Sequence, residues 1–234
     1  MPEAIKWGLL IVGAYLLGSV PAAYLAARWS RGIDIRRCGD GNVGATNLTR
    51  LTSKRIAIPV IIFDVGKGAL MVWAAQLLGL DITQQVTVGL AAIIGHNWPV
   101  FLRFNGGRGI FTSLGVISIL APWLGLIALI IAYGMAPFRQ LALGTIIALA
   151  SLPIFSWFLS QPLGVTDKLP LALGFLVIFL VVVIRRLTAP RTIFTASVSP
   201  GRLLANRLLF DRDIRDREAW INQRQSQTEK QRGG

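Results

Sequence analysis

Several residue types that a soluble or metal-dependent protein relies on are scarce in this sequence. Only 15% of its residues are charged, against about 25% in an average globular chain, so a compact body in water would lack polar surface. The single cysteine, Cys38, excludes an intrachain disulfide. One cysteine and one histidine, His96, provide no ligand cluster for structural zinc, and no Walker A phosphate loop occurs anywhere. We therefore predict a protein without metal or cofactor.

What the sequence has in excess is apolar length. Apolar residues make up 53% of the 234, and the mean hydropathy is +0.59. A helix needs about 20 mostly apolar residues to cross a bilayer, so this composition predicts an all-α integral membrane protein with five to seven membrane helices. Five runs have about the required length: Ile5–Ala27, Ile56–Leu80, Val86–Leu102, Leu141–Ser160 and Leu169–Ile184.

The stretch 110–137 is ambiguous, because Ala121-Pro122 interrupts it. It fits either one long kinked helix or two short helices that form a hairpin. A single crossing would place Arg139 and the basic C-terminal tail outside, whereas a split at Pro122 keeps both inside, as the positive-inside rule requires. We therefore favour seven segments, with the N-terminus outside and the C-terminus cytoplasmic.

The net charge of +13 is concentrated between the apolar runs. Residues 28–55 hold seven basic and two acidic side chains, and residues 185–234 hold eleven and five. This placement indicates membrane topology rather than a nucleic-acid partner.

The charge distribution also predicts two parts: a multi-pass membrane domain over 1–190 and a basic cytoplasmic tail over 191–234. Part of the tail is amphipathic, so it either lies on the anionic inner leaflet or is solvated. Its apolar and basic residues alternate: Leu203, Leu204, Leu208, Phe210 and Ile214 with Arg202, Arg207, Arg212, Arg215 and Arg217. The last dozen residues have the composition of a disordered segment.

Two glycine-rich loops are predicted on the cytoplasmic side. The first runs from Gly39 to Asn47 and is followed by Arg50, and the second is Gly106-Gly107-Arg108-Gly109. Glycines at 39, 41 and 44 match G-x-G-x-x-G, but no strand precedes them, so a dinucleotide fold is not indicated. Closely spaced glycines can turn successive N–H groups toward an anion, and an arginine can clamp a phosphate. The alternative is that the glycines only permit turns.

A few polar residues are expected at membrane depth, where ionisable side chains are costly and face the protein interior or a cavity. Asp64 and Lys67 lie three residues apart on one helical face, so a neutralising structural pair is the simplest interpretation. His96 is either a general base or a helix-end residue that donates to a backbone carbonyl.

The order and spacing of these motifs resemble the bacterial acyl-phosphate:glycerol-3-phosphate acyltransferases of the PlsY family. The resemblance is continuous over about residues 10–120. It is carried by Gly18-Ser19-Val20-Pro21, Asp34-Ile35-Arg36, the first glycine loop with Arg50, the segment Phe63 to Gly68, and Gly95 to Phe101 followed by the second glycine loop.

This resemblance implies an enzyme of the bacterial inner membrane, with its active loops on the cytoplasmic face. It would transfer a fatty acyl group from acyl phosphate to the 1-hydroxyl of sn-glycerol 3-phosphate and form lysophosphatidic acid for phospholipid synthesis. Its expected partners are these two substrates, the lipid bilayer and an acyl-phosphate-forming enzyme upstream. The resemblance assigns catalytic roles to Arg50, Arg108 and Asn47. It implies substrate-binding roles for Gly39, Gly41, Asn42, Gly44, Thr46, Gly106, Gly107 and Gly109. We add Lys67 and His96, the polar residues at membrane depth, as candidate substrate-binding residues.

The sequence departs from the family pattern at several motif positions. Asp40 and Ala142 stand where the family has serine, and Asn105 stands where it has lysine. The family's histidine and asparagine after the last span are absent from Arg185-Arg186-Leu187-Thr188-Ala189. Two alternatives to the acyltransferase stay open. One, favoured by Asp40 and Ala142, is a paralogue that binds phosphorylated lipid precursors without turnover or acylates another acceptor; the other is a transporter. A transporter would place its polar residues near the midplane rather than at the helix ends.

Overall fold

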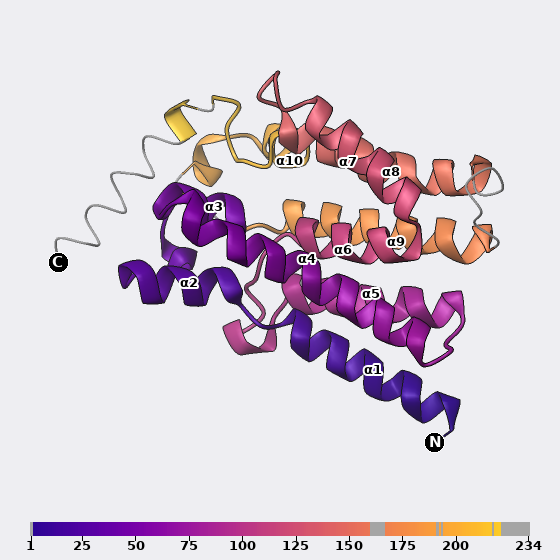
Figure 1. Ribbon diagram of the computed structural model, residues 1–234. Coiled ribbons are helices and arrows are strands. Elements are labelled where there is room, and N and C mark those ends of the chain that lie inside the picture. The colour runs from indigo at the N-terminus through magenta and orange to yellow at the C-terminus, as the bar shows by residue number, and fades with distance from the viewer. Residues whose placement is uncertain (1, 160–166, 191, 193, 217, 221–234) are drawn as a thin grey trace.

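The computed structural model describes residues 2–159, 167–190, 192, 194–216 and 218–220, and within them it is helical with no strand. The predicted disorder of the last dozen residues concerns positions outside this range. The α-helices lie side by side along one direction (Figure 1). They are α1 (Glu3–Gly18), α2 (Ala22–Arg31), α3 (Ala45–Leu51), α4 (Lys54–Leu77), α5 (Ile82–Asn97), α6 (Ile110–Leu120), α7 (Pro122–Gly134), α8 (Leu141–Phe158), α9 (Lys168–Leu187) and α10 (Pro200–Phe210), with short 3-10 turns η1 (Ile35–Arg37), η2 (Val100–Leu102) and η3 (Thr195–Ser197).

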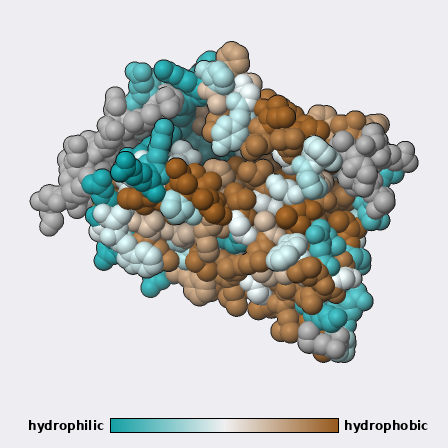
Figure 2. All heavy atoms as spheres, in the orientation of Figure 1, coloured by the Kyte–Doolittle hydropathy of each residue, from teal (hydrophilic) through white to brown (hydrophobic). Residues whose placement is uncertain are grey.

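The prediction of an all-α membrane protein is confirmed. Within the described residues four helical segments are long and apolar enough to cross a membrane: 3–31, α4, α8 and α9. Their outward surfaces are apolar, as the brown flank in Figure 2 shows, and many large apolar side chains there are exposed, for example Ile62 at 66% and Leu77 at 67%. Such surface is typical of helices that face lipid.

The first predicted span, Ile5–Ala27, lies inside the segment 3–31 that can cross a membrane, but it is not one continuous helix, because α1 ends at Gly18 and α2 begins only at Ala22, after Pro21. The third predicted span has the wrong ends. It ends at Asn97 rather than Leu102, since Pro99 disfavours helical backbone at the preceding residue. Its start is also earlier, at Ile82, where Asp81 and Gln84 form a capping box.

The stretch 110–137 is divided at Pro122, as the charge argument predicts. Ala121 separates α6 from α7, and Pro122 occupies the first turn of α7. With 11 and 13 residues, these helices are about 17 and 20 Å long, shorter than the hydrocarbon core of about 30 Å. Both pack into the bundle, α6 mainly on α4 and α7 mainly on α8.

Small residues let α4 and α6 approach closely, which is how membrane helices associate without a hydrophobic driving force between them. A Cβ added to Gly68 of α4 would collide with the backbone oxygen of Thr112, and one added to Gly115 of α6 would collide with that of Val65. This contact fixes α6, and therefore the loop that precedes it, against the centre of the bundle.

The basic segments gather at one end of the bundle, on the left of Figure 1, where α2, α3 and α10 lie; the N-terminus is at the other end. We call this the loop end. Helix α10 lies in the predicted tail, yet it packs on α8 and α9. Arg207 anchors it, because its buried guanidinium donates to the carbonyls of Leu187 and Ala189 and pairs with Asp213 at 2.8 Å.

Candidate active site

The first glycine loop is built around Asn47, whose side chain is wholly buried. Asn47 Nδ2 donates to the carbonyls of Cys38 at 3.0 Å and Asn42 at 3.1 Å, and its Oδ1 accepts from the backbone N–H of Asp40 at 3.2 Å. The structure therefore gives Asn47 a role in shaping the loop and does not place it on a pocket surface. Gly39 follows from this geometry, since it has a φ of +56° and a Cβ there would collide with Asn47 Oδ1.

The second glycine loop is held from two sides. At the end of α5, the backbone oxygens of His96 and Asn97 accept from the N–H groups of Gly107 at 3.0 Å and Gly106 at 3.3 Å. From the side, buried Arg185 of α9 donates to the carbonyls of Gly106 at 2.7 Å and Gly107 at 2.9 Å.

The same Arg185 also reaches Asn105, whose Oδ1 accepts from Nη2 at 3.2 Å. Arg108 is therefore presented by a loop whose backbone is tied to both α5 and α9. Asn105, which departs from the family's lysine, acts here as a hydrogen-bond acceptor for that tie.

Three ionisable residues form a buried group that we call the closed cluster: Asp64, Lys67 and His96. Lys67 Nζ lies 2.8 Å from Asp64 Oδ1, 2.9 Å from His96 Nδ1 and 3.0 Å from the Gly18 carbonyl. An ammonium has three donors, and here each has one acceptor. The predicted Asp64–Lys67 pair is confirmed, and the Gly18 carbonyl is available to Lys67 because α1 ends there.

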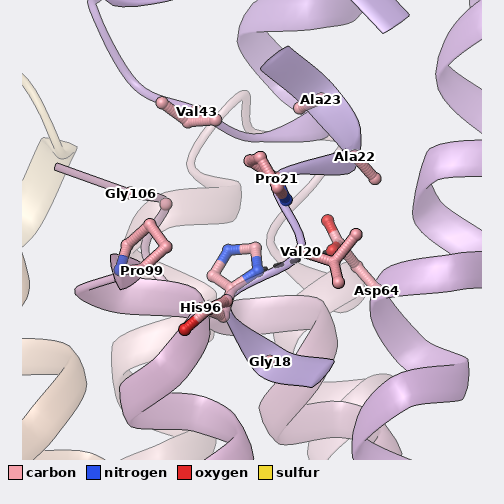
Figure 3. A pocket seen from close by; sticks show the side chains of 12 residues that line it. Gly18, Val20, Pro21, Ala22, Ala23, Val43, Asp64, His96, Pro99 and Gly106 are labelled. Atoms are coloured by element: carbon pink, nitrogen blue, oxygen red, sulfur yellow. Dashed lines mark ion pairs between the residues drawn. The ribbon is translucent and has the colours of Figure 1, made fainter. Parts of the chain in front are cut away.

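His96 connects the closed cluster to the second glycine loop. Figure 3 shows its ring between Asp64 and Gly18 on one side and Pro99 and Gly106 on the other. His96 Nδ1 lies 2.9 Å from Lys67 Nζ and 3.4 Å from Asp64 Oδ1. An ammonium only donates, so with Lys67 charged the ring proton is assigned to Nε2. A Cβ on Gly107 would collide with Nε2, so Gly107 must be glycine for the loop to rest on the imidazole. His96 Nδ1 contacts Lys67 rather than the backbone carbonyl that the sequence led us to expect.

A large pocket of about 480 Å³ opens at the loop end. Its polar part is lined by Asp40, Asn42, Gly44, Thr46, Arg50, Asp64, His96, Arg108, Gly109, Arg186 and Asp211. Its apolar part follows α6, α7 and α8 and includes Ile110, Phe111, Leu114, Ile117, Leu129, Ala132, Ala148 and Leu149. Figure 2 shows hydrophilic side chains around a hollow at this end.

The structure divides the predicted site residues into two groups. Arg50, Arg108, Asn42, Gly44, Thr46, Gly109 and His96 line the pocket. Gly39, Gly41, Asn47, Lys67, Gly106 and Gly107 lie beneath it or beside it, where they shape or support the two loops. No group of three metal-ligating side chains occurs in the described part of the chain.

The charged side chains at the polar end form a second group, which we call the open cluster: Asp40, Arg50, Arg108, Arg186 and Asp211. Arg50 Nη1 and Arg108 Nη1 each lie 3.7 Å from Asp40 Oδ2. Arg108 Nε is 2.6 Å and Arg186 Nε is 3.9 Å from Asp211 Oδ1. Burial raises the pKa of the Asp211 carboxyl, and the guanidiniums of Arg108 and Arg186 oppose this rise. The arrangement juxtaposes three guanidiniums at the head of an apolar pocket.

Two residues of the open cluster, Arg186 and Asp211, are not among the site residues that the sequence predicts. Arg186 had a signal, because a second arginine at the end of an apolar span is costly to bury unless it has partners. Asp211 had none, since it is one of several acidic residues in the tail and joins the site only through the packing of α10.

The comparisons with known proteins agree with one another. The model of a family described as glycerol-3-phosphate acyltransferase matches residues 8–196. A relative from Dehalococcoides mccartyi (strain ATCC BAA-2266), named glycerol-3-phosphate acyltransferase 5, is 48% identical over 94% of this chain and 95% of its own. A Synechococcus sp. (strain CC9902) protein, named glycerol-3-phosphate acyltransferase, is 45% identical over 62% of this chain and 74% of its own.

Two crystal structures are also similar. Both are of PlsY (YgiH), described as an integral membrane glycerol 3-phosphate acyltransferase, in its glycerol 3-phosphate and lysophosphatidic acid forms. Each matches 93% of this chain and 98% of its own with a TM-score of 0.69, at 28% and 29% identity.

Proposed function

Since the chain belongs to the glycerol-3-phosphate acyltransferase family, we propose that it makes lysophosphatidic acid in the pocket at the loop end, with acyl phosphate as the donor and the 1-hydroxyl of glycerol 3-phosphate as the acceptor. It is an integral membrane enzyme of phospholipid synthesis.

The observation that carries the proposal is the division of the pocket into a cationic head and an apolar body. Arg108 immediately precedes α6, and Ile110, Phe111 and Leu114 of that helix continue the pocket wall away from it. An acyl phosphate whose phosphate lies at Arg108 can therefore lay its chain along α6, α7 and α8. Arg50, Asn42 and Thr46 face the same polar end from α3 and its loop, where a second phosphate-bearing substrate can bind.

The chemistry requires little more than this positioning. The acceptor hydroxyl attacks the acyl carbonyl carbon, an ester C–O bond forms, and the bond between the acyl carbon and the phosphate oxygen breaks. The hydroxyl proton leaves with the departing phosphate, so no nucleophile on the protein is needed. Guanidiniums stabilise the charge that develops on the leaving phosphate, and holding both substrates in one pocket supplies proximity. We assign the stabilisation of the leaving phosphate to Arg108, whose loop is anchored by the hydrogen bonds from Arg185.

The departures from the family pattern have structural counterparts that support retained activity. Asp40 lies between Arg50 and Arg108, so its charge is shared by two cations. The backbone oxygen of Ala142 accepts from Arg186 Nη1 at 3.0 Å, and Arg186 supplies a cation at a place where the family's histidine is missing.

For topology, we propose that the loop end is cytoplasmic and that the membrane is the bacterial inner membrane. The basic segments 28–55, 103–109 and 139 lie at that end, as the positive-inside rule requires of cytoplasmic loops. The N-terminus would then be outside and the C-terminus inside, with residues 1–190 as the membrane domain and 191–234 as a tail whose α10 docks on it. An upstream enzyme that forms acyl phosphate must supply the donor.

The test is an assay on membrane vesicles with palmitoyl phosphate and labelled glycerol 3-phosphate. We expect labelled lysophosphatidic acid from the wild type, none when palmitoyl-CoA replaces palmitoyl phosphate, and about a hundredfold less from Arg108→Ala, as for loss of one charge-stabilising donor. Arg55→Ala is the matched control, since Arg55 is exposed at the loop end and does not line the pocket. Product from the wild type no greater than from Arg108→Ala would refute the proposal.

A further inference from the structure

Arg186 is the largest wholly enclosed side chain in the described part of the protein, at 2% exposed. Its Nη1 donates to the carbonyls of Ala142 and Leu208, both at 3.0 Å. Among the described residues no atom accepts a hydrogen bond from its Nε, although the residue lines the pocket. A buried guanidinium with an unused donor costs free energy, so this donor is available to an anionic group that binds in the pocket.

The nearest anion to that donor is the carboxylate of Asp211. Asp211 Oδ1 lies 2.6 Å from Arg108 Nε and 3.9 Å from Arg186 Nε, so a single oxygen lies between two guanidiniums and binds only one at hydrogen-bond distance. The Asp211 side chain is 21% exposed, whereas Arg186 is enclosed. The carboxylate is therefore the accessible partner in this contact.

We propose that Asp211 is an internal stand-in for a substrate phosphate, and that Arg186 joins Arg108 in binding this phosphate once the carboxylate is displaced. The proposal rests on the proposed function for the identity of the substrate. A phosphate group has three acceptor oxygens and a charge of about −1.5 to −2, so it can satisfy both Nε donors at once, which one carboxylate oxygen at these distances does not.

Charge balance indicates the direction of the effect. The open cluster contains three arginines and two aspartates. With both carboxylates in place, the arginines exceed the aspartates by one charge, so an entering phosphate meets a nearly neutral site. If the charge of Asp211 is removed, the net positive charge of the site is larger and phosphate is attracted more strongly. Asp211 therefore weakens phosphate binding and sets its affinity.

The displacement requires a movement of the Asp211 side chain rather than of the tail. Before Asp211 in the chain, the guanidinium of Arg207 donates to the carbonyl of Leu187 at the end of α9. After Asp211, the carboxylate of Asp213 pairs with that same guanidinium at 2.8 Å. Asn206 Nδ2 also donates to the Asp213 carbonyl at 3.0 Å. These anchors hold the backbone around Asp211 while its carboxylate swings out of the pocket.

The first measurement is steady-state kinetics with each substrate varied at saturating concentrations of the other. For Asp211→Asn we expect KM to fall about three- to tenfold for one substrate, without loss of kcat, because a hydrogen bond between charged groups no longer competes. Arg186→Gln should raise KM for that same substrate. The substrate whose KM moves in both variants, glycerol 3-phosphate or palmitoyl phosphate, is the one whose phosphate binds there.

Asp34→Asn is the matched control, because Asp34 is also paired with an arginine, Arg36 at 2.7 Å, but does not line the pocket. It should leave both KM values unchanged. Since Arg186 also links α8 to α10, Arg186→Lys, which keeps donors for the two carbonyls, is measured beside Arg186→Gln. A rise in KM for Asp211→Asn would overturn the proposal. A fall in KM for Arg186→Lys would overturn it as well.

A second measurement separates this proposal from the proposed function. Calorimetric titration of the purified enzyme with inorganic phosphate requires no acyl transfer. Tighter binding by Asp211→Asn and weaker binding by Arg186→Lys would support the stand-in even if the wild type made no lysophosphatidic acid. Unchanged or weaker binding by Asp211→Asn would refute it, however active the enzyme is.

Discussion

The two charged clusters of this protein differ in how fully their members are satisfied. In the closed cluster, one ammonium meets three acceptors at 2.8–3.0 Å and every side chain is buried. In the open cluster, arginines outnumber carboxylates and three of the four ion pairs are 3.7–3.9 Å long. Complete pairing is typical of structural support, whereas surplus charge beside a pocket is available to a ligand. The closed cluster supports the second glycine loop through His96. The open cluster includes Arg108, which that loop carries.

The largest effect should come from breaking the closed cluster. Asp64→Ala leaves the buried ammonium of Lys67 without its carboxylate, and removal of one partner of a buried pair costs about 3–5 kcal/mol. We expect a strong loss of folded protein, measured as detergent-solubilised yield and by thermal unfolding.

The double variant Asp64→Ala with Lys67→Met removes both charges and should recover part of the lost stability. A double variant as unstable as the single one would show that the charge balance is not what the cluster contributes.

The next effect should come from Gly107→Ala, which acts where the two clusters meet. The added methyl group would collide with His96 Nε2, so the loop must lift and carry Arg108 out of place. We expect kcat/KM to fall about a hundredfold, since small displacements of a positioning group are costly, with a smaller change in thermal stability. Gly66→Ala is the control, because a Cβ there meets nothing within 4 Å. Equal activity in the two variants would contradict the support that we assign to His96.

A smaller effect is expected for Arg50→Ala in the open cluster. Arg50 has a side chain that is 40% exposed and a single ion pair at 3.7 Å, so it contributes little to folding. We expect KM for glycerol 3-phosphate to rise about tenfold, as for a lost charged hydrogen bond, while the unfolding temperature stays unchanged. Losses of expression and activity in the same proportion would instead assign Arg50 a structural role.

The smallest effect should come from restoring the family's serines. Asp40→Ser with Ala142→Ser removes one carboxylate from the open cluster and leaves the backbone carbonyl of residue 142 for Arg186. Because both departures are already accommodated, kcat/KM should rise only a few-fold, as expected for one partly exposed charge. A rise of a hundredfold or more would mean that the wild type is impaired by these residues.

Much of the fold could be predicted from local sequence. Apolar length located α4, α8 and α9, and the alternation of basic and apolar segments predicted the division at Pro122. The break in the first span before Pro21 and the wrong end of the third span before Pro99 share one cause, since an apolar run continues past a proline that interrupts a helix. Within the site, glycine spacing and the following arginines identified Arg50 and Arg108, and the structure brings both to one carboxylate. The same spacing grouped Asn47 and Lys67 with the binding residues, because composition does not distinguish a side chain under a loop from one above it.

The sequence by itself determined that this is a membrane protein, where its helices lie, and that two glycine-rich loops carry the arginines of its site. These properties depend on residues within about twenty positions of each other, so the local pattern contains them. Only the tertiary structure decided which charges are satisfied. Arg185 braces the loop that carries Arg108, Asp211 from beyond α9 reaches Arg108, and Arg186 keeps an unused donor beside both. Those relations depend on ångström distances between helices far apart in the chain, and they separate the residues that hold the pocket from those that bind in it.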